Sequence, residues 1–265
     1  MTALMITPLQ LGITALLVVL CAALSLILAL GVQRQLLIAA LRMTAQLLIV
    51  GLFLRQIFAL SSAWPTGLVI CAMLAAATIE VGARQERRLR GIWHYLIGGA
   101  PIVVVTLGVA LLALTMALQP SPWYDARHAI PLVGIILGTV MNSASVALNY
   151  VFSTVTRERH AIEARRALGA SRYVAFHDII RRAVRAGLLP IMNQMAAAGI
   201  ITMPGLMTGQ ILAGMDPTAA ARYQILLLLL LAGGGFLATV GATLLAVRQL
   251  SDERERLRLD RLQQR

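Results

Sequence analysis

Long uninterrupted runs of apolar residues constrain this chain more than any other feature of its sequence. A helix that crosses the hydrocarbon core of a bilayer needs roughly 20 mostly apolar residues. We expect each stretch that meets this requirement to be a membrane-spanning helix: residues 11–32, 36–60, 64–83, 95–118, 130–152, 188–214 and 223–247. The sequence therefore predicts an all-α fold, a polytopic bundle of about seven transmembrane helices.

The composition agrees with a fold whose solvent is lipid. Hydrophobic residues make up 59% of the 265 residues and charged residues only 13%, whereas a soluble domain carries about 25% charged residues. We expect residues 1–250 to form one transmembrane domain and residues 251–265 to form a charged, solvated helical tail. The first run lacks a basic segment before it and a cleavage site after it, so it is interpreted as a retained anchor.

All 23 basic residues are arginines, and their positions predict the orientation. If the N-terminus lies outside the cytoplasm, most arginines fall on the inner side, around Arg34 and in residues 84–90, 157–185 and 248–265. The outer side then holds three arginines, namely Arg55, Arg127 and Arg222. The positive-inside rule therefore predicts an outer N-terminus and an inner C-terminus. Because orientation accounts for the net charge of +12, we expect no nucleic-acid partner.

The absence of lysine excludes several functions. A phosphate-binding P-loop requires its lysine, so the chain is not a P-loop ATPase, and a lysine Schiff base is equally impossible. No His cluster or nucleophile–base pair lies near the spans, which argues against a membrane-embedded enzyme, and we expect no cofactor. Cys21 and Cys71 lie in apolar runs without metal-ligand spacing and are expected to be buried small hydrophobes. The sequence identifies no ligands for a metal ion.

Residues 153–187, here called the coupling loop, form the longest segment expected outside the membrane. Gly169 suits the end of a short helix, and Ser171 then suits the N-cap of the next one. The apolar residues that follow recur at spacings of three and four, which predicts one face of a helix: Tyr173, Phe176, Ile180 and Val184. Such a helix would lie along the membrane surface or dock on a partner.

The coupling loop resembles the cytoplasmic loop of ABC-transporter membrane subunits. That loop has the pattern E-A-A, three residues, G, nine residues, then I-x-L-P, and this chain matches it at Glu163, Ala164, Gly169 and Ile179. It departs at Arg165, where the second Ala is expected, and the Leu-Pro pair comes eight residues late at residues 189–190. The resemblance implies that the segment from Glu163 to Ala170 contacts an ATPase.

Other stretches resemble the FetB-type iron-export permeases, a family that includes plant permeases linked to aluminium tolerance. The most specific run is residues 203–217, MPGLMTGQILAGMDP, followed by AARYQI at 220–225. The segments GIILG at 134–138 and MN at 141–142 also fit, as do Arg42, Gln46 and Gly51 in the second span. The resemblance covers nearly the whole chain, from about residue 34 to residue 247.

The resemblance implies a membrane subunit of an ATP-driven transporter in a bacterial inner membrane, exporting iron or a similar metal ion. Such permeases work as two copies with two separate ABC ATPase chains, so a homodimer is implied. The missing P-loop fits a motor supplied by another chain. An ABC permease for another small solute or an anion, including an importer, stays open, because the loop pattern does not separate the two.

Polar residues within the spans are candidates for a translocation path, since such groups tend to face a bundle interior or water. In the second span Arg42 and Gln46 share a face, although Arg42 could instead reach the membrane surface. In the fifth span a polar stripe aligns at spacings of three and four, with one methionine beside it: Met141, Asn142, Ser145 and Asn149. Hydrogen bonding between helices is the alternative role for that stripe.

The sixth span contributes a second set of path candidates: Met203, Pro204, Gly205, Met207 and Gln210. Thioethers could contact a soft metal, but methionine also serves as flexible packing. A proline within a span frees a carbonyl, so a broken helix at Pro204 could offer backbone oxygen to an ion. Glu80 is the one acidic residue within a span, and it either pairs with Arg84 or binds a cation at the inner entrance.

Overall fold

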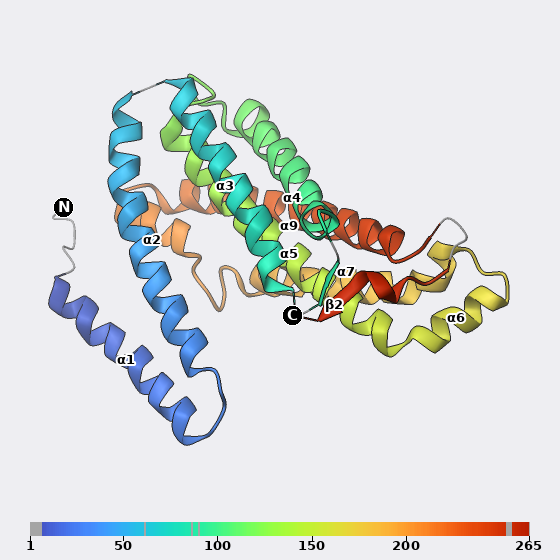
Figure 1. Ribbon diagram of the computed structural model, residues 1–265. Helices are drawn as coiled ribbons and strands as arrows, with labels where there is room; N and C mark the ends of the chain where they lie inside the picture. Colours follow the sequence, from blue (N-terminus) through green and yellow to red (C-terminus); the bar gives the residue numbers. More distant parts are fainter. Residues whose placement is uncertain (1–6, 61, 86, 90, 253–255, 265) are drawn as a thin grey trace. The chain divides into compact units, whose positions relative to one another are not determined.

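The computed structural model describes residues 7–60, 62–85, 87–89, 91–252 and 256–264. Within these residues the chain is almost entirely helical (Figure 1). The α-helices are α1 (Pro8–Ile27), α2 (Gln33–Leu60), α3 (Ala63–Arg84), α4 (Trp93–Leu112), α5 (Ala126–Arg157), α6 (Arg159–Ala167), α7 (Arg172–Ala197), α8 (Gly205–Leu212) and α9 (Pro217–Gln249). A π-helical segment, η1 (Ala113–Leu118), continues α4. Arg90, Arg254 and Arg265, which we counted as inner arginines, lie outside the described residues.

Six helices of the described chain are long and apolar enough to cross a membrane: α1, α2, α3, α4 with η1, α5 and α9. The predicted helical membrane bundle is therefore confirmed as a fold class. The span count and the orientation stay predictions. α1 begins after Thr7 in a capping box: the Thr7 hydroxyl accepts from the Gln10 backbone N–H, and the Gln10 side chain accepts from the Thr7 backbone N–H.

The predicted sixth span at 188–214 is wrong as a continuous helix. α7 begins at Arg172 and continues through Pro190 to Ala197, so the helix expected on the membrane surface and the start of the span are one element. The chain then turns at Gly199, whose φ is +86°, and α8 begins only after Pro204. A left-handed glycine ends a helix readily, whereas α7 tolerates the lost hydrogen bond at Pro190.

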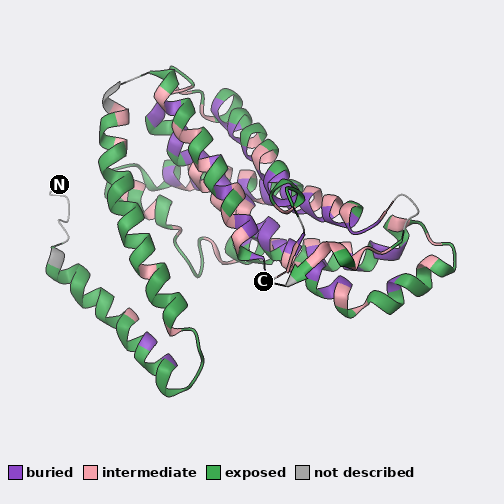
Figure 2. Cartoon of the chain, in the orientation of Figure 1, coloured by how far each residue is buried: buried purple, intermediate pink, exposed green. Residues whose placement is uncertain are grey.

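The chain divides into two compact units, Met1–Ser61 and Ser62–Arg265. The first unit is a hairpin of α1 and α2, closed by a turn in which Gly31 has a φ of +74°. The Ser25 hydroxyl donates to the Gln33 side chain at 3.3 Å and accepts from the Val32 backbone. Among the described side chains of this hairpin, Ala22 and Ser25 are buried and nearly all others are exposed (Figure 2). Cys21 is exposed, and so is Cys71 in α3, so the prediction that both cysteines are buried is wrong.

The second unit has α5 at its centre, packed against α3, α4, α7 and α9. Figure 2 shows buried residues concentrated along α5 and α9. Small residues let these helices approach closely: a Cβ added at Gly187 of α7 would lie 2.6 Å from the carbonyl oxygen of Ser143 in α5. Gly235 of α9 also faces Ser143. Close packing through small residues is typical of helices within membranes.

The charged tail is not the solvated helix that its sequence predicts. Its described part contains a short 3-10 turn, η2 (Leu259–Arg261), and a strand, β2 (Leu262–Gln264). This strand pairs antiparallel with β1 (Arg87–Leu89), which lies between α3 and α4. Leu257, Leu259 and Leu262 pack against the core, and their spacings of two and three do not form one stripe at the helical period of 3.6.

Candidate functional site

The coupling loop contains a helical hairpin made of α6, a tight turn and the start of α7. Gly169 has a φ of +87°, and it donates its N–H to the Arg166 carbonyl while Ala170 donates to that of Arg165. This pair of hydrogen bonds is a Schellman motif, in which glycine avoids the steric penalty of a left-handed residue. Ser171 then precedes α7 as its N-cap. Both helix boundaries predicted from Gly169 and Ser171 are therefore confirmed.

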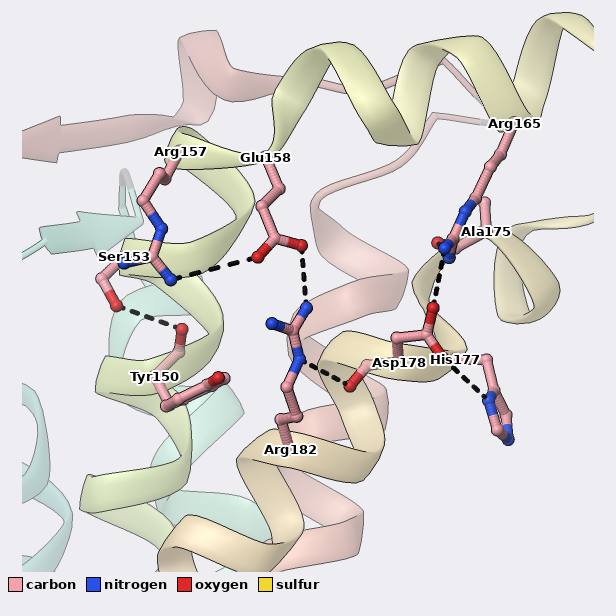
Figure 3. A network of polar contacts seen from close by, with 9 residues as sticks. All are labelled: Tyr150, Ser153, Arg157, Glu158, Arg165, Ala175, His177, Asp178 and Arg182. Atoms are coloured by element: carbon pink, nitrogen blue, oxygen red, sulfur yellow. Dashed lines mark hydrogen bonds and ion pairs between the residues drawn. The ribbon is translucent and has the colours of Figure 1, made fainter.

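Two ion pairs brace this hairpin (Figure 3). Arg165 of α6 donates to the Asp178 carboxylate of α7 at 2.7 Å. Arg182 of α7 donates to Glu158, the residue between α5 and α6, at 2.8 Å, and its Nε also donates to the Asp178 backbone carbonyl at 3.3 Å. We call these contacts the hairpin brace. It joins the end of α5, α6 and α7.

The charges of the brace stabilise each other's ionised forms. The hydrogen bond and the charge of Arg165 lower the pKa of the Asp178 carboxyl. The hydrogen bond between Arg182 and Glu158 raises the pKa of the Arg182 guanidinium. Beneath the brace, Ile162 of α6 and Phe176 of α7 are buried in one hydrophobic core. The hairpin is thus held together by the burial of Ile162 and Phe176 and by the two ion pairs of the brace.

The face of α7 that is buried within the chain consists of small and apolar residues at helical spacing: Ala175, Phe176, Ile179, Ala183, Gly187 and Ile191. Of the four residues predicted to share an apolar face, Phe176 is buried here and Ile180 and Val184 are half-buried. Tyr173 is 53% exposed. Contact of this face with a membrane surface or a partner stays a prediction.

The tip of the hairpin presents apolar side chains to its surroundings. Leu168 is 88% exposed, and Tyr173 and Val174 are also exposed. They border an open hollow of about 550 Å³ that Arg165 and Asp178 also line. Glu163 and Ala164 lie on the exposed side of α6, and the Glu163 carboxylate is 4.0 Å from the His160 ring. Exposed apolar groups ringed by charges are typical of protein-binding surfaces.

A polar cluster joins α3 to α5. The Arg84 guanidinium donates to the Glu80 carboxylate at 3.2 Å and to the Asn142 side-chain oxygen at 2.7 Å. The Asn149 side chain donates to the Arg84 backbone carbonyl at 3.5 Å. Asn142 and Asn149 therefore both contact the C-terminal end of α3. This agrees with the alternative that the polar stripe forms hydrogen bonds between helices. The pairing of Glu80 with Arg84 agrees with the alternative given for Glu80. Asn142 is nevertheless exposed on the surface of this unit.

The other residue of the polar stripe lies deeper. Ser145 is buried, and its backbone carbonyl accepts a hydrogen bond from the Gln85 side chain at 3.4 Å. Met141 is half-buried beside it. The stripe from α5 therefore contacts the end of α3 through Arg84 and Gln85, two residues that sequence reasoning did not select as its partners.

The predicted path residues of the interrupted segment lie on and before α8, which packs against α9. Met203 is 63% exposed, whereas Met207 and Pro204 are half-buried. The Pro204 carbonyl accepts from both the backbone N–H and the hydroxyl of Thr208, so it is already satisfied by Thr208 and is not left open by the break. The side-chain oxygen of Gln210 is buried and has no hydrogen-bond partner among the described residues.

Arg42 and Gln46 lie on one exposed face of α2, in the first compact unit. Gly205 begins α8 and leaves open space around its Cα. The described residues hold no group of three or more His, Cys, Asp or Glu side chains placed to bind a metal ion. The assignment of all these residues to a path stays a prediction.

Comparison with known proteins places the chain in a family. The model of the uncharacterised protein family UPF0014 matches residues 8–251. The UPF0014 membrane protein slr1647 of Synechocystis is 37% identical over 86% of this chain and 87% of its own length. The probable iron export permease protein FetB of Escherichia coli is 28% identical over 86% of each chain.

A plant relative is also similar: the protein ALUMINUM SENSITIVE 3 of Arabidopsis thaliana is 27% identical over 82% of this chain and 77% of its own length. No solved structure gave a significant match. The resemblance to FetB-type permeases and their plant counterparts is thereby confirmed. The chain belongs to the UPF0014 family of membrane proteins.

Proposed function

We propose that this chain is the membrane subunit of an ATP-driven ABC exporter for iron or a similar metal ion, and that it works as a homodimer with two copies of a separate ATPase. The observation that carries the proposal is the braced hairpin of α6 and α7, which bears the loop pattern Glu163, Ala164 and Gly169. The ion and the direction of transport are supported by the similarity to FetB of Escherichia coli.

The hairpin of α6 and α7 has two features that would let it transmit force from an ATPase: an exposed apolar tip and a braced connection to long helices. Its tip offers an exposed leucine, Leu168, and an apolar hollow to a partner. Its base continues directly into α5 and α7, and the brace holds the two arms together. Closure of the ATPase on ATP would therefore push α6 as a rigid body and move α5 and α7 with it.

The cluster of Glu80, Arg84 and Asn142 supports a polar path beside α3 and α5. Asn142 lies within a predicted span and is exposed on its unit, and so is Arg84 at the end of α3. Polar groups within a membrane tend to face a bundle interior or water. We infer that this face lines the path or contacts the second copy, where a hard cation would replace Arg84 at the carboxylate and amide oxygens.

One observation favours a second candidate, an ABC permease for a small anion. The Arg84 guanidinium donates to both the Glu80 carboxylate and the Asn142 side-chain oxygen, so the oxygens that would suit a cation are already occupied by a cationic group. Replacing Glu80 by Gln should impair cation transport more than Arg84→Gln does. The reverse order would favour the anion.

The first experiment is metal accumulation in cells with and without this gene and a neighbouring ATPase gene. We expect cells that lack either gene to retain more iron when iron is in excess. Equal iron contents, with a changed content of another solute, would contradict iron export and direct attention to the second candidate. As part of the same proposal, the protein is located in a bacterial inner membrane with its C-terminus in the cytoplasm.

The second experiment tests the docking surface by co-purification with the ATPase. Leu168→Ser, Glu163→Ala and Gly169→Val should each reduce the amount of ATPase recovered, because they alter the tip of the hairpin or its turn. Leu212→Ser is the control, since Leu212 of α8 is also a well exposed leucine, 65% exposed against 88% for Leu168. Undiminished recovery with normal ATPase activity in all three variants would remove the hairpin as the docking surface.

A further inference from the structure

A cavity of about 680 Å³ lies where the end of α9, the start of α7 and the tail meet. Four arginines from these three segments line it: Arg172, Arg248, Arg256 and Arg261. The one acidic residue among its described lining residues is Asp252. The cavity is separate from the hairpin tip and from the polar cluster of α3 and α5.

The walls of this cavity are built from specific hydrogen bonds. Arg261 donates to the Gln249 carbonyl at 2.8 Å, which ties the tail to the end of α9. Arg172 donates to the Asp252 carbonyl at 3.1 Å, and the Asp252 carboxylate accepts from the Arg256 backbone N–H at 2.6 Å. Leu250 and Ser251, at the base of the tail, are buried. Backbone carbonyls therefore hold the Arg172 and Arg261 side chains beside the cavity, and Asp252 holds the backbone of Arg256.

Most of the donor capacity of these arginines is unused. A guanidinium carries five N–H donors. The Nε of Arg172 is buried and has no partner among the described residues. Within the described chain, the guanidinium groups of Arg248 and Arg256 make no hydrogen bond or ion pair. The described lining residues of the cavity therefore carry four positive charges against the one negative charge of Asp252.

We propose that this cavity binds the phosphate group of an anionic membrane lipid. Guanidinium groups match phosphate oxygens in a bidentate geometry and are favoured for phosphate recognition. A phosphate would supply acceptors that the Arg172 Nε and the guanidinium groups of Arg248 and Arg256 do not find among the described residues, and it would relieve the repulsion among four like charges.

The position of the cavity favours a lipid over a soluble phosphate. Arg248 lies in the last turn of α9, a helix long and apolar enough to cross the membrane. The cavity therefore opens at the level where the headgroups of the adjoining leaflet lie. Basic pockets at this level commonly hold anionic headgroups. Since Arg172 directly follows the turn of the coupling hairpin, a bound lipid would also fix the start of α7.

Native mass spectrometry of the full chain in mild detergent tests the proposal. Phosphatidylglycerol should stay bound to the purified protein more strongly than phosphatidylcholine. The double variant Arg248→Gln/Arg256→Gln should weaken phosphatidylglycerol binding at least tenfold, because two charge-assisted contacts are lost. Both side chains are exposed, so these changes spare the core. Arg256→Gln alone should cause a smaller loss in the same direction.

The matched control is Arg181→Gln/Arg185→Gln, which removes the same charge from exposed positions of α7 outside the cavity. This control should bind phosphatidylglycerol like the unaltered chain. An equal loss in both double variants would overturn the proposal in favour of diffuse charge attraction. Binding of inorganic phosphate without any preference among lipids would overturn the lipid as its source. The measurement needs no ATPase and no transport, so its outcome is independent of the proposed function.

Discussion

At the residue scale, glycine sets how closely the helices of the second unit approach. The Cα of Gly187 faces the Ser143 carbonyl so closely that an added methyl group would overlap a backbone atom. Backbone in the centre of a bundle cannot move aside as the end of a flexible side chain can. The contact between α5 and α7 therefore depends on the absence of a side chain at this one position.

Gly187→Ala should destabilise the protein by about 1–3 kcal/mol, the usual cost of overpacking a core. Thermal unfolding in detergent would measure the change. Gly108→Ala is the control, because a Cβ at Gly108 of α4 meets nothing within 4 Å. A melting temperature of Gly187→Ala that equals that of the control would mean that α5 and α7 do not pack as described.

At the element scale, the brace between α6 and α7 is expected to persist over a wide pH range. The pKa of Asp178 is lowered in the folded protein, so its ionised form contributes stability above the usual aspartate pKa of about 3.9. That contribution is lost only as the pH falls through the lowered value. The protection of α6 should therefore be the same at pH 7 and pH 5.

Hydrogen exchange of residues 159–171, corrected for its intrinsic pH dependence, checks this expectation. Asp178→Asn should raise exchange in α6 at both pH values, since the acceptor for Arg165 loses its charge. Asp260→Asn is the control, because Asp260 pairs with Arg258 in the tail. Loss of α6 protection between pH 7 and pH 5 in the unaltered chain would contradict the role given to Asp178.

At the scale of the whole molecule, the face formed by Glu80, Arg84 and Asn142 should be open to water in the assembled transporter. A cysteine introduced at Asn142 or Gln210, after removal of Cys21 and Cys71, should react with a small soluble thiol reagent in at least one state of the ATP cycle. Val104→Cys is the control, since Val104 of α4 is 70% exposed and is expected to face lipid. Labelling of Val104→Cys alone would reverse this assignment.

How far the sequence predicts the structure depends on how local each feature is. The turn at Gly169 and the N-cap at Ser171 were predictable, because helix ends are decided by neighbouring residues. The contact between Arg84 and Asn142 joins positions 58 residues apart, and only the packing of α3 against α5 creates it. The sequence alone therefore could not predict that Arg84 is the partner of Asn142.

Two errors have the same kind of cause. The apolar content of residues 188–214 suggested one span, but hydropathy does not register the left-handed turn at Gly199. The charge pattern of the tail suggested a solvated helix, but three leucines find apolar contacts on the core. A single backbone angle outweighed composition in residues 188–214, and tertiary contacts outweighed it in the tail.

The pairing of β2 with β1 has a consequence for synthesis of the protein. β1 (Arg87–Leu89) directly follows α3, whereas its partner strand, Leu262–Gln264, follows α9. During translation, β1 therefore leaves the ribosome long before β2 exists. The hydrogen-bonding edge of β1 stays unpaired until residue 264 has been made, and a product that stopped before residue 262 would leave this edge bare.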